Sequence, residues 1–216
     1  MSKNDKTKEI QNNIKVILLG EAGVGKTSII LRYIQNKFNP SQTSTFGATY
    51  LIKDIERGNN KYKLYVWDTT GQEKYHSVTK LFVQNANIVI LVYSINDINS
   101  FKALDYWRKT IKEMLGDNFI LAIAGNKYDL INSMSEEEVE KALVPEEKVV
   151  EYAKENDSLF KLVSAKEDGV GINGLFDMVV DAYINKNKGK NVNENDSIQI
   201  DRKKNRKKDN KKSCCS

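Results

Sequence analysis

The sequence has 216 residues, 40% of them hydrophobic, and a formal net charge of +5. This length suits one domain with a tail or two small domains. The sequence contains no run of about eighteen apolar residues, the length that a transmembrane helix needs. Residues 202–212 hold eight Lys/Arg and one Asp, a net charge of +7, so the rest of the chain carries about −2, which argues against a basic nucleic-acid-binding body.

The two ends of the chain are polar but differ in chemistry. Residues 1–13 lack the apolar core of a signal peptide, and Ser2 stands where N-myristoylation requires glycine. Both cysteines, Cys214 and Cys215, lie beside the last residue. The body therefore contains no disulfide framework, which favours a reducing, intracellular setting.

The hydrophobic period changes repeatedly between strand and helix along the chain. Apolar runs predict strands at residues 14–19, 88–93, 119–124 and 159–163, and a Gly/Asn turn at residues 58–60 predicts a hairpin between strands 48–56 and 61–67. Helical spacing predicts helices at residues 27–36, 101–115, 149–154 and 172–184. This alternation predicts an α/β fold, a mostly parallel sheet with helices on both faces and ligands beyond the carboxyl ends of the strands.

The predicted organisation is one folded domain, residues 14–185, between a flexible N-terminal segment, residues 1–13, and a tail, residues 186–216. The tail is rich in Asn, Lys and Asp and lacks the apolar content to pack, so disorder is expected there. Residues 131–143, with three consecutive glutamates from Glu136, are expected to form a long, acidic, solvated surface connection.

A phosphate-binding motif lies between the first predicted strand and the first predicted helix. Residues 20–27 read GEAGVGKT, which fits G-x-x-x-x-G-K-[ST] in the context that the motif requires. Its glycines let backbone N–H groups turn toward phosphate oxygens, and the helix N-terminus adds a positive dipole. Lys26 is expected to reach the β- and γ-phosphates, and the Thr27 hydroxyl to bind Mg²⁺.

Mg²⁺ prefers octahedral oxygen ligands, so a carboxylate at the end of a neighbouring strand is expected. Asp68 follows the predicted strand 61–67 and opens the sequence DTTGQ at residues 68–72. A strand-end aspartate is often only a cap. With a phosphate loop upstream, we predict Asp68 to be an indirect or water-mediated partner of the metal.

The sequence Asn126-Lys127-Tyr128-Asp129 follows the predicted strand 119–124. Guanine presents two adjacent donors that one carboxylate can accept, so Asp129 is predicted to select guanine over adenine. The Lys127 stem can cover the base plane. Ser164-Ala165-Lys166 follows the last predicted strand, where backbone N–H groups can meet guanine O6.

These motifs, in this order, resemble the Ras superfamily of small GTPases, and more finely the Rab family and its endosomal branch. The resemblance runs from about residue 14 to 184 and resumes at the C-terminus. It implies a P-loop small G-domain with six strands, one of them antiparallel, that binds GTP or GDP with Mg²⁺ and hydrolyses GTP. The residues that carry it are 19–28, 36–38, 45–48, 67–76, 125–129, 164–166 and 214–216.

The resemblance implies further residue roles. Phe38 is expected to stack near the base, and Thr45 to be a magnesium ligand that senses the γ-phosphate. Gly71 is expected to donate its N–H to the γ-phosphate, and Gln72 to orient the attacking water. The expected catalytic set is Lys26, Thr45, Gly71 and Gln72, and the expected metal set is Thr27, Thr45 and Asp68. The expected nucleotide-binding set is Ala22, Gly23, Val24, Gly25, Lys26, Thr27, Ser28, Phe38, Thr45, Gly71, Asn126, Lys127, Asp129, Ser164, Ala165 and Lys166.

The resemblance also implies partners. Two switch loops would be ordered by GTP and released after hydrolysis. Tyr50, Trp67 and Phe82 match the aromatic triad that Rab effectors contact, the plain alternative being ordinary core aromatics. The expected partners are effectors of the GTP form, a guanine nucleotide exchange factor, a GTPase-activating protein, and a GDP-dissociation inhibitor with a prenylation escort. The chain is expected to be a monomer that acts in vesicle trafficking at the cytosolic face of endosomal or vesicle membranes and cycles with the cytosol.

Two residues depart from the family pattern. Thr70 stands where Rab proteins typically carry alanine, and its hydroxyl would lie close to the γ-phosphate. The hypothesis is that Thr70 slows hydrolysis or is itself phosphorylated. The methyl group of Ala22 is expected to crowd Gln72. Both changes predict weak intrinsic turnover.

The C-terminus resembles the Rab double-cysteine ending. It is not a C-a-a-X box, because Ser213 is the fourth residue from the end. The resemblance implies geranylgeranyl groups on Cys214 and Cys215, and two chains give stable anchoring. The basic run at residues 202–212 would add about 1 kcal/mol per basic residue near an anionic leaflet. A nuclear-import stretch or a merely solvated tail are the alternatives.

Four functions are therefore weighed. The first is a membrane-cycling GTPase, and the second is a scaffold that holds GTP without hydrolysing it, as Thr70 would allow. The third is a P-loop enzyme that uses ATP, such as a kinase, against which Asp129 argues. The fourth is a nucleic-acid binder acting through the tail, against which the near-neutral body argues.

Overall fold

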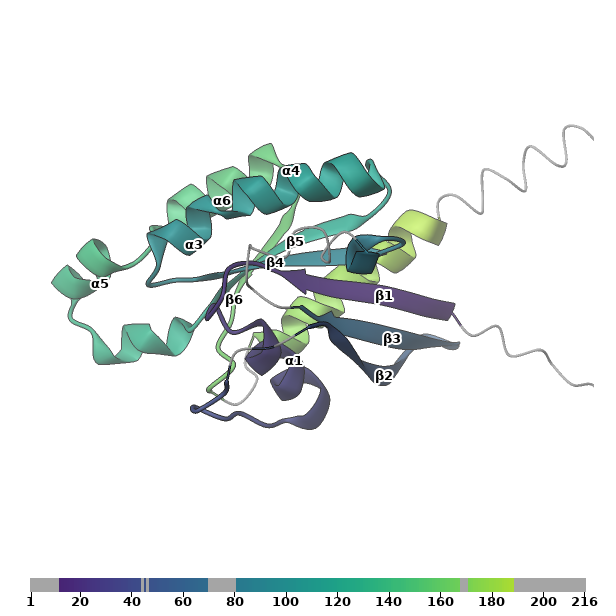
Figure 1. The fold of residues 1–216 in the computed structure, drawn as a ribbon, viewed down its shortest axis with the longest axis horizontal. Coiled ribbons are helices and arrows are strands. Elements are labelled where there is room, and N and C mark those ends of the chain that lie inside the picture. Colours follow the sequence, from purple (N-terminus) through teal and green to yellow (C-terminus); the bar gives the residue numbers. More distant parts are fainter. Residues whose placement is uncertain (1–11, 44, 46, 70–80, 168–170, 189–216) are drawn as a thin grey trace, which may run out of the picture. The chain divides into compact units, whose positions relative to one another are not determined.

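The computed structural model describes residues 12–43, 45, 47–69, 81–167 and 171–188 (Figure 1). Six strands form one sheet in the order β2-β3-β1-β4-β5-β6. β2 and β3 pair antiparallel, and the other neighbours pair parallel. The predicted α/β fold with one antiparallel strand is confirmed. The strands are β1 (Asn12–Leu19), β2 (Thr49–Arg57), β3 (Asn60–Asp68), β4 (Ile88–Ser94), β5 (Ile120–Asn126) and β6 (Leu159–Leu162).

Helices cover both faces of this sheet. Figure 1 shows α1 (Lys26–Gln35) on one face, and α3 (Ile98–Lys102), α4 (Leu104–Leu115) and α6 (Glu146–Glu155) on the other. Residues 172–188 are also helical. The chain divides into two compact units, Met1–Val179 and Val180–Ser216, and the described residues of the second unit are 180–188.

The strands form where the sequence has continuous apolar runs. All seven residues of β4 are buried, as expected for a central strand covered on both faces. One cluster of buried side chains joins β1, β4 and β5 to α4 and α6 and includes Tyr93, Trp107 and Val149. Burying each large apolar side chain stabilises the fold by about 1.5–3 kcal/mol. This core holds the carboxyl ends of the parallel strands in fixed positions.

The predicted helix at residues 101–115 is two helices, α3 and α4. α3 begins three residues earlier than predicted because the Asp97 side chain accepts the N–H groups of Asn99 and Ser100, a typical N-cap. The two helices meet at Ala103, and α4 ends at Leu115, followed by the C-cap Gly116 with a positive φ of 65°.

The expected solvated connection at residues 131–143 contains regular structure, which corrects the prediction. A 3₁₀ helix, η2 (Tyr128–Ser133), precedes a short helix, α5 (Glu136–Ala142). A capping box begins α5, in which the Ser135 N–H donates to Glu138 Oε2 (2.8 Å) and Ser135 Oγ accepts the Glu138 N–H. The acidic side chains Glu136, Glu137 and Glu138 are exposed, as expected.

Candidate functional site

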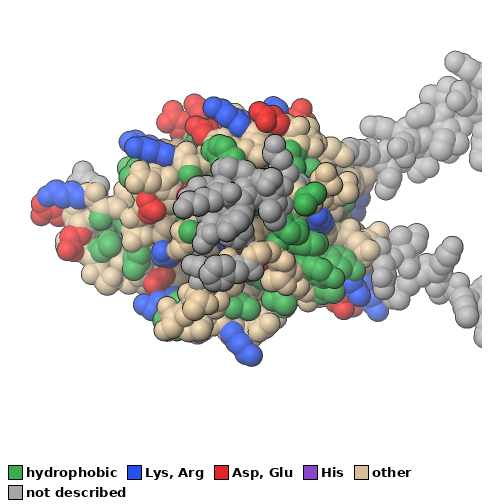
Figure 2. All heavy atoms as spheres, in the orientation of Figure 1, with side chains coloured by type: hydrophobic (Ala, Val, Ile, Leu, Met, Phe, Trp, Pro, Cys, Tyr) green, Lys and Arg blue, Asp and Glu red, His purple; other side chains and the backbone are tan. Residues whose placement is uncertain are grey.

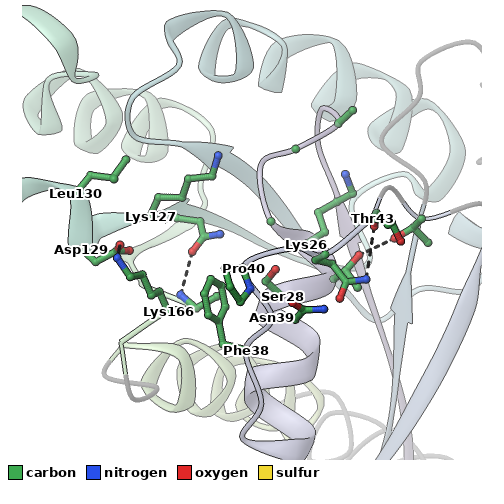
Figure 3. Close-up of a pocket in the computed structure, with 18 of the residues that line it drawn as sticks. Lys26, Ser28, Phe38, Asn39, Pro40, Thr43, Lys127, Asp129, Leu130 and Lys166 are labelled. Carbon is green, nitrogen blue, oxygen red and sulfur yellow. Dashed lines mark hydrogen bonds and ion pairs between the residues drawn. The ribbon is translucent and has the colours of Figure 1, made fainter.

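A cavity of about 390 Å³ lies beyond the carboxyl ends of the parallel strands. Its lining comes from the loop after β1, the start of α1, Thr69 after β3, the end of β5 with the loop that follows it, and the loop after β6. The segment after α1 contributes Phe38, Asn39, Pro40, Gln42, Thr43 and Thr45. Figure 3 shows Lys26 and Ser28 toward one side of it, and Asp129 and Lys166 toward the other. The structure thus brings the predicted phosphate and base residues into one hollow.

Glycine is required by geometry at two positions of the loop after β1. Gly20 has a φ of 147°, and a Cβ there would lie 2.1 Å from the carbonyl oxygen of Val92. Gly25 has a φ of 94°, and a Cβ there would lie 2.3 Å from Asn126 Nδ2. Gly25 is also the N-cap of α1 and contributes no side-chain cap. The loop can therefore pass close to β4 and Asn126 and leave the first N–H groups of α1 toward the cavity.

Lys26 is a buried cation at the floor of the cavity. Its side chain donates to the carbonyl oxygens of Gly20 (2.8 Å) and Glu21 (2.9 Å), and the residue is 5% exposed. Burial lowers the pKa of the Lys26 ammonium to about 8, against the opposing charges of Asp68 and Glu21. An anion in the cavity would compensate this buried charge, so the site suits a phosphate group.

Thr27, Thr45 and Asp68 converge beside Lys26. The hydroxyls of Thr27 and Thr45 are 2.7 Å apart, and Thr45 Oγ1 donates to Asp68 Oδ2 at 3.4 Å. Asp68 Oδ1 is buried and has no hydrogen-bond partner among the described residues. Burial raises the pKa of the Asp68 carboxyl, because the Thr27 hydrogen bond and the Lys26 charge offset desolvation only in part. Two hydroxyls and an unpaired carboxylate oxygen fit Mg²⁺, which prefers hard oxygen ligands.

Asp129 lies at the opposite end of the cavity. Its side chain is 8% exposed, accepts a hydrogen bond from Ser164 Oγ (2.7 Å), and lies 3.6 Å from the Lys166 ammonium. The Ser164 hydroxyl also accepts the N–H of Glu167 at 3.0 Å. These contacts to Oδ1 and Oδ2 hold the Asp129 carboxylate in place against the loop after β6. An anchored carboxylate can accept two adjacent N–H donors of a ring.

Known proteins resemble this chain in sequence. A sequence model of the Ras family matches residues 15–185. Ras-related protein Rab-21 of Bos taurus is 44% identical over 118 residues, which cover 55% of this chain and 53% of the relative. Ras-related protein Rab-31 of Rattus norvegicus is 35% identical over 196 residues, with 88% and 96% covered. Ras-like GTP-binding protein RYL2 of Yarrowia lipolytica is 35% identical over 175 residues, with 80% and 81% covered.

The chain belongs to the Ras family. The predicted resemblance to this family and to its Rab members is confirmed by the family match and by the Rab-21 and Rab-31 relatives. The matched region spans about half the length of the Rab-21 proteins of Bos taurus and Homo sapiens.

The structure of this Ras-family chain places most of the predicted nucleotide-binding residues in the cavity wall. Val24 and Ser164 are buried instead, and each acts through a hydrogen bond to a neighbouring loop residue. Thr70, Gly71, Gln72, Cys214 and Cys215 lie outside the described residues. The predicted residues in the wall are Ala22, Gly23, Gly25, Lys26, Thr27, Ser28, Phe38, Thr45, Asn126, Lys127, Asp129, Ala165 and Lys166.

The three aromatics predicted to bind effectors form one continuous surface. The ring centroids of Tyr50 and Trp67 are 4.9 Å apart, and those of Trp67 and Phe82 are 5.6 Å apart. Tyr50 is 45% exposed, while Trp67 and Phe82 are half-buried. Two other exposed apolar side chains, Ile52 and Leu81, belong to the same part of the molecule, and Figure 2 shows hydrophobic side chains gathered over β2 and β3.

Part of the cavity wall was not predicted from the sequence. Six lining residues were not predicted: Asn39, Pro40, Gln42, Thr43, Thr69 and Leu130. Four of them lie between Phe38 and Thr45, two residues that were predicted, so the whole segment could have been included. The hydrogen bond from Trp107 Nε1 to Glu21 Oε1 (3.3 Å) was not predicted either, because the two residues are 86 positions apart in the sequence.

Proposed function

We propose that this chain is a guanine-nucleotide switch that binds GTP or GDP with Mg²⁺, hydrolyses GTP to GDP and phosphate, and recruits effectors in membrane trafficking. The observation that carries the proposal is one cavity with Lys26, Thr27 and Thr45 at one end, where Thr45 contacts Asp68, and Asp129 at the other. A ligand with both an anionic group and a donor-rich ring matches both ends. The GTP-binding name of the Yarrowia lipolytica relative supports the same ligand.

The residues divide the work of holding the nucleotide. Lys26 and the N–H groups at the start of α1 bind the phosphates. The Thr27 and Thr45 hydroxyls and Asp68 would hold Mg²⁺, and the ion would neutralise charge on the phosphate oxygens. Asp129 accepts the N1–H and 2-amino group of guanine, and the Lys127 stem and Phe38 cover the base.

Base selection by Asp129 gives the first test. The purified chain, stripped of nucleotide with EDTA, is titrated with GDP, ADP and xanthosine diphosphate in excess Mg²⁺. GDP is expected to bind about 10⁴-fold more tightly than ADP. Asp129→Asn is expected to move the preference to xanthosine diphosphate, whereas Asp105→Asn, at an exposed aspartate of α4, keeps the wild-type order. Equal affinities of the wild type for GDP and ADP would refute the proposal.

Hydrolysis rests on Gln72 and Gly71 and is qualified by Thr70 and by Ala22, which lines the cavity. We propose slow intrinsic turnover. Single-turnover phosphate release is measured for the wild type, Gln72→Leu, Thr70→Ala and Ala22→Gly. Faster release by the Thr70 and Ala22 variants and loss of release by the Gln72 variant support a slow GTPase. No release by the wild type even with a GTPase-activating protein would favour the alternative, a GTP-bound scaffold on membranes.

Membrane attachment is proposed through geranylgeranyl groups on Cys214 and Cys215 and the basic run at residues 202–212. In the described part of the chain, no helix has both the length and the apolar character needed to cross a bilayer. Endosomal or vesicle membranes are proposed on the Rab-21 and Rab-31 relationship, with exchange factor, GTPase-activating protein, GDP-dissociation inhibitor, escort and effectors as partners. Imaging tagged wild type and a Cys214→Ser/Cys215→Ser variant against an endocytic tracer tests the location.

A further inference from the structure

Among the described residues, the guanidinium of Arg32, in the last turn of α1, donates hydrogen bonds to two segments at the base end of the cavity. Nε donates to the Ala165 carbonyl oxygen (2.9 Å), and Nη2 to the Lys166 carbonyl oxygen (3.0 Å). Nη1 donates to the carbonyl oxygen (3.2 Å) and Oδ1 (3.0 Å) of Asn36. Arg32 itself does not line the cavity. One half-buried side chain thus joins two segments that are 129 or more residues apart.

The first segment is the loop after β6, which forms one wall of the base end. Ala165 is 3% exposed, and its N–H donates to Asn126 Oδ1 at 3.2 Å. A base oxygen at this position would share or replace that bond, so the placement of the Ala165 backbone matters. Asn126 and Asp129 hold this loop from the side of β5, and Arg32 holds its carbonyl oxygens from the side of α1.

The second segment is the exit of α1. Asn36 ends the helix in the left-handed region, with φ 51° and ψ 39°, and turns the chain toward Phe38, which lines the cavity. By binding both oxygens of Asn36, the Arg32 guanidinium fixes this turn. The same residue therefore sets the Phe38 side and the Ala165 side of the base end.

We propose that Arg32 is a positioning residue that holds both walls of the base pocket and so sets how long the nucleotide stays bound. The proposal rests on the guanine-nucleotide function proposed above and adds a residue that controls release. Arginine suits the role because its planar fork presents five donors in fixed geometry, whereas a lysine ammonium is a single point on a flexible stem.

The test is the dissociation of a fluorescent GDP analogue from the full chain in excess Mg²⁺ and unlabelled GDP. Arg32→Ala is expected to release the nucleotide about ten- to hundredfold faster. The variant loses hydrogen bonds from a charged group, and each loss of about 1.4 kcal/mol corresponds to a tenfold change in rate. Arg32→Lys is expected to be intermediate. Asn36→Gly keeps the left-handed turn and removes only the Oδ1 contact, so its effect is expected to be the smallest of the three.

A base-dependent readout separates positioning from general loosening. The diphosphate of 2-aminopurine riboside lacks both O6 and the N1–H of guanine, so the wild type should release it faster than GDP, and the N1–H contact to Asp129 is lost equally in wild type and Arg32→Ala. If Arg32 places the Ala165 wall, Arg32→Ala reduces the ratio of the two dissociation rates. If Arg32 only stabilises the fold, both nucleotides leave faster by the same factor and the ratio stays constant, which overturns the proposal.

The matched control is Arg57→Ala, at the end of β2, where Arg57 pairs with Asp177 away from the cavity. It is expected to leave GDP dissociation at the wild-type rate. Thermal unfolding of each variant with GDP bound tests whether the variant is folded. If Arg32→Ala does not fold, Arg32→Lys takes its place in the dissociation measurements. Suppose that the wild type prefers GDP to ADP but the Arg32 variants release GDP at the wild-type rate. That result overturns this inference and leaves the proposed function standing. A chain without that preference overturns the proposed function.

Discussion

Asn126, the last residue of β5, ties Val24 in the loop after β1 to Ala165 in the loop after β6. Its Nδ2 donates to the Val24 carbonyl oxygen at 2.8 Å, and its Oδ1 accepts the Ala165 N–H at 3.2 Å. The residue is 2% exposed, so water does not compete for these bonds. One amide therefore couples the phosphate end of the cavity to the base end, and a ligand that spans the cavity depends on both bonds.

Asn126→Ala is expected to weaken GDP binding by about thirtyfold or more. The change leaves a buried carbonyl and a buried N–H without partners, which costs about 2 kcal/mol or more. Equilibrium titration with GDP measures the loss. Asn156→Ala removes an amide that donates to the Tyr152 carbonyl oxygen away from the cavity, and it should bind GDP like the wild type. Similar losses in both variants would argue against a specific role of Asn126.

Asp68→Asn is expected to raise the Mg²⁺ concentration needed to retain GDP by about tenfold, a typical cost of losing an outer partner of a metal. The amide preserves the shape of the side chain but removes the charge of the unpaired Oδ1. GDP dissociation measured across a series of free Mg²⁺ concentrations gives the midpoint. With EDTA, the wild type and the variant should release GDP at similar rates. An unchanged midpoint would exclude Asp68 from the metal site.

The sequence predicted the sheet because buried parallel strands are continuous apolar runs, such as Ile88–Tyr93. It also predicted the ends of the cavity, because Lys26, Thr27 and Asp129 lie in short local motifs. The role of Arg32 could not be predicted, since its Ala165 partner is 133 residues away and meets it only in the folded chain. The helix α5 could have been predicted from Ser135 and Glu138, but the run of glutamates favoured a solvated loop.

The aromatic triad should separate stability from partner binding. Trp67 packs on Tyr50 and Phe82, and the Lys15 ammonium lies 4.8 Å from its ring centroid. Trp67→Ala is therefore expected to lower the free energy of unfolding by about 2–3 kcal/mol, and the half-exposed Tyr50→Ala by about 1 kcal/mol or less. Urea denaturation of the GDP-bound chain measures both.

Tyr106→Ala, at a comparably exposed tyrosine of α4, is the control for the triad. It should resemble Tyr50→Ala in stability, while only Tyr50→Ala weakens binding of an effector of the GTP form. A loss for Tyr50→Ala as large as that for Trp67→Ala would mean that the triad is ordinary core packing.

The capping box of α5 should make this helix sensitive to acid. The N–H and hydroxyl of Ser135 both donate to Glu138 and hold the pKa of its carboxyl below its usual value of 4.5. Because the pKa is lower in the folded state, this stabilisation is present above pH 4.5 and is lost as the pH falls through the lowered pKa.

Hydrogen exchange of residues 136–142, compared with α6 between pH 7 and pH 3, should show a selective loss of protection at low pH. Glu138→Gln keeps an acceptor without a titrating group and should remove the pH dependence, whereas Glu136→Gln should retain it. The same acid response in wild type and Glu138→Gln would show that the capping box does not control α5.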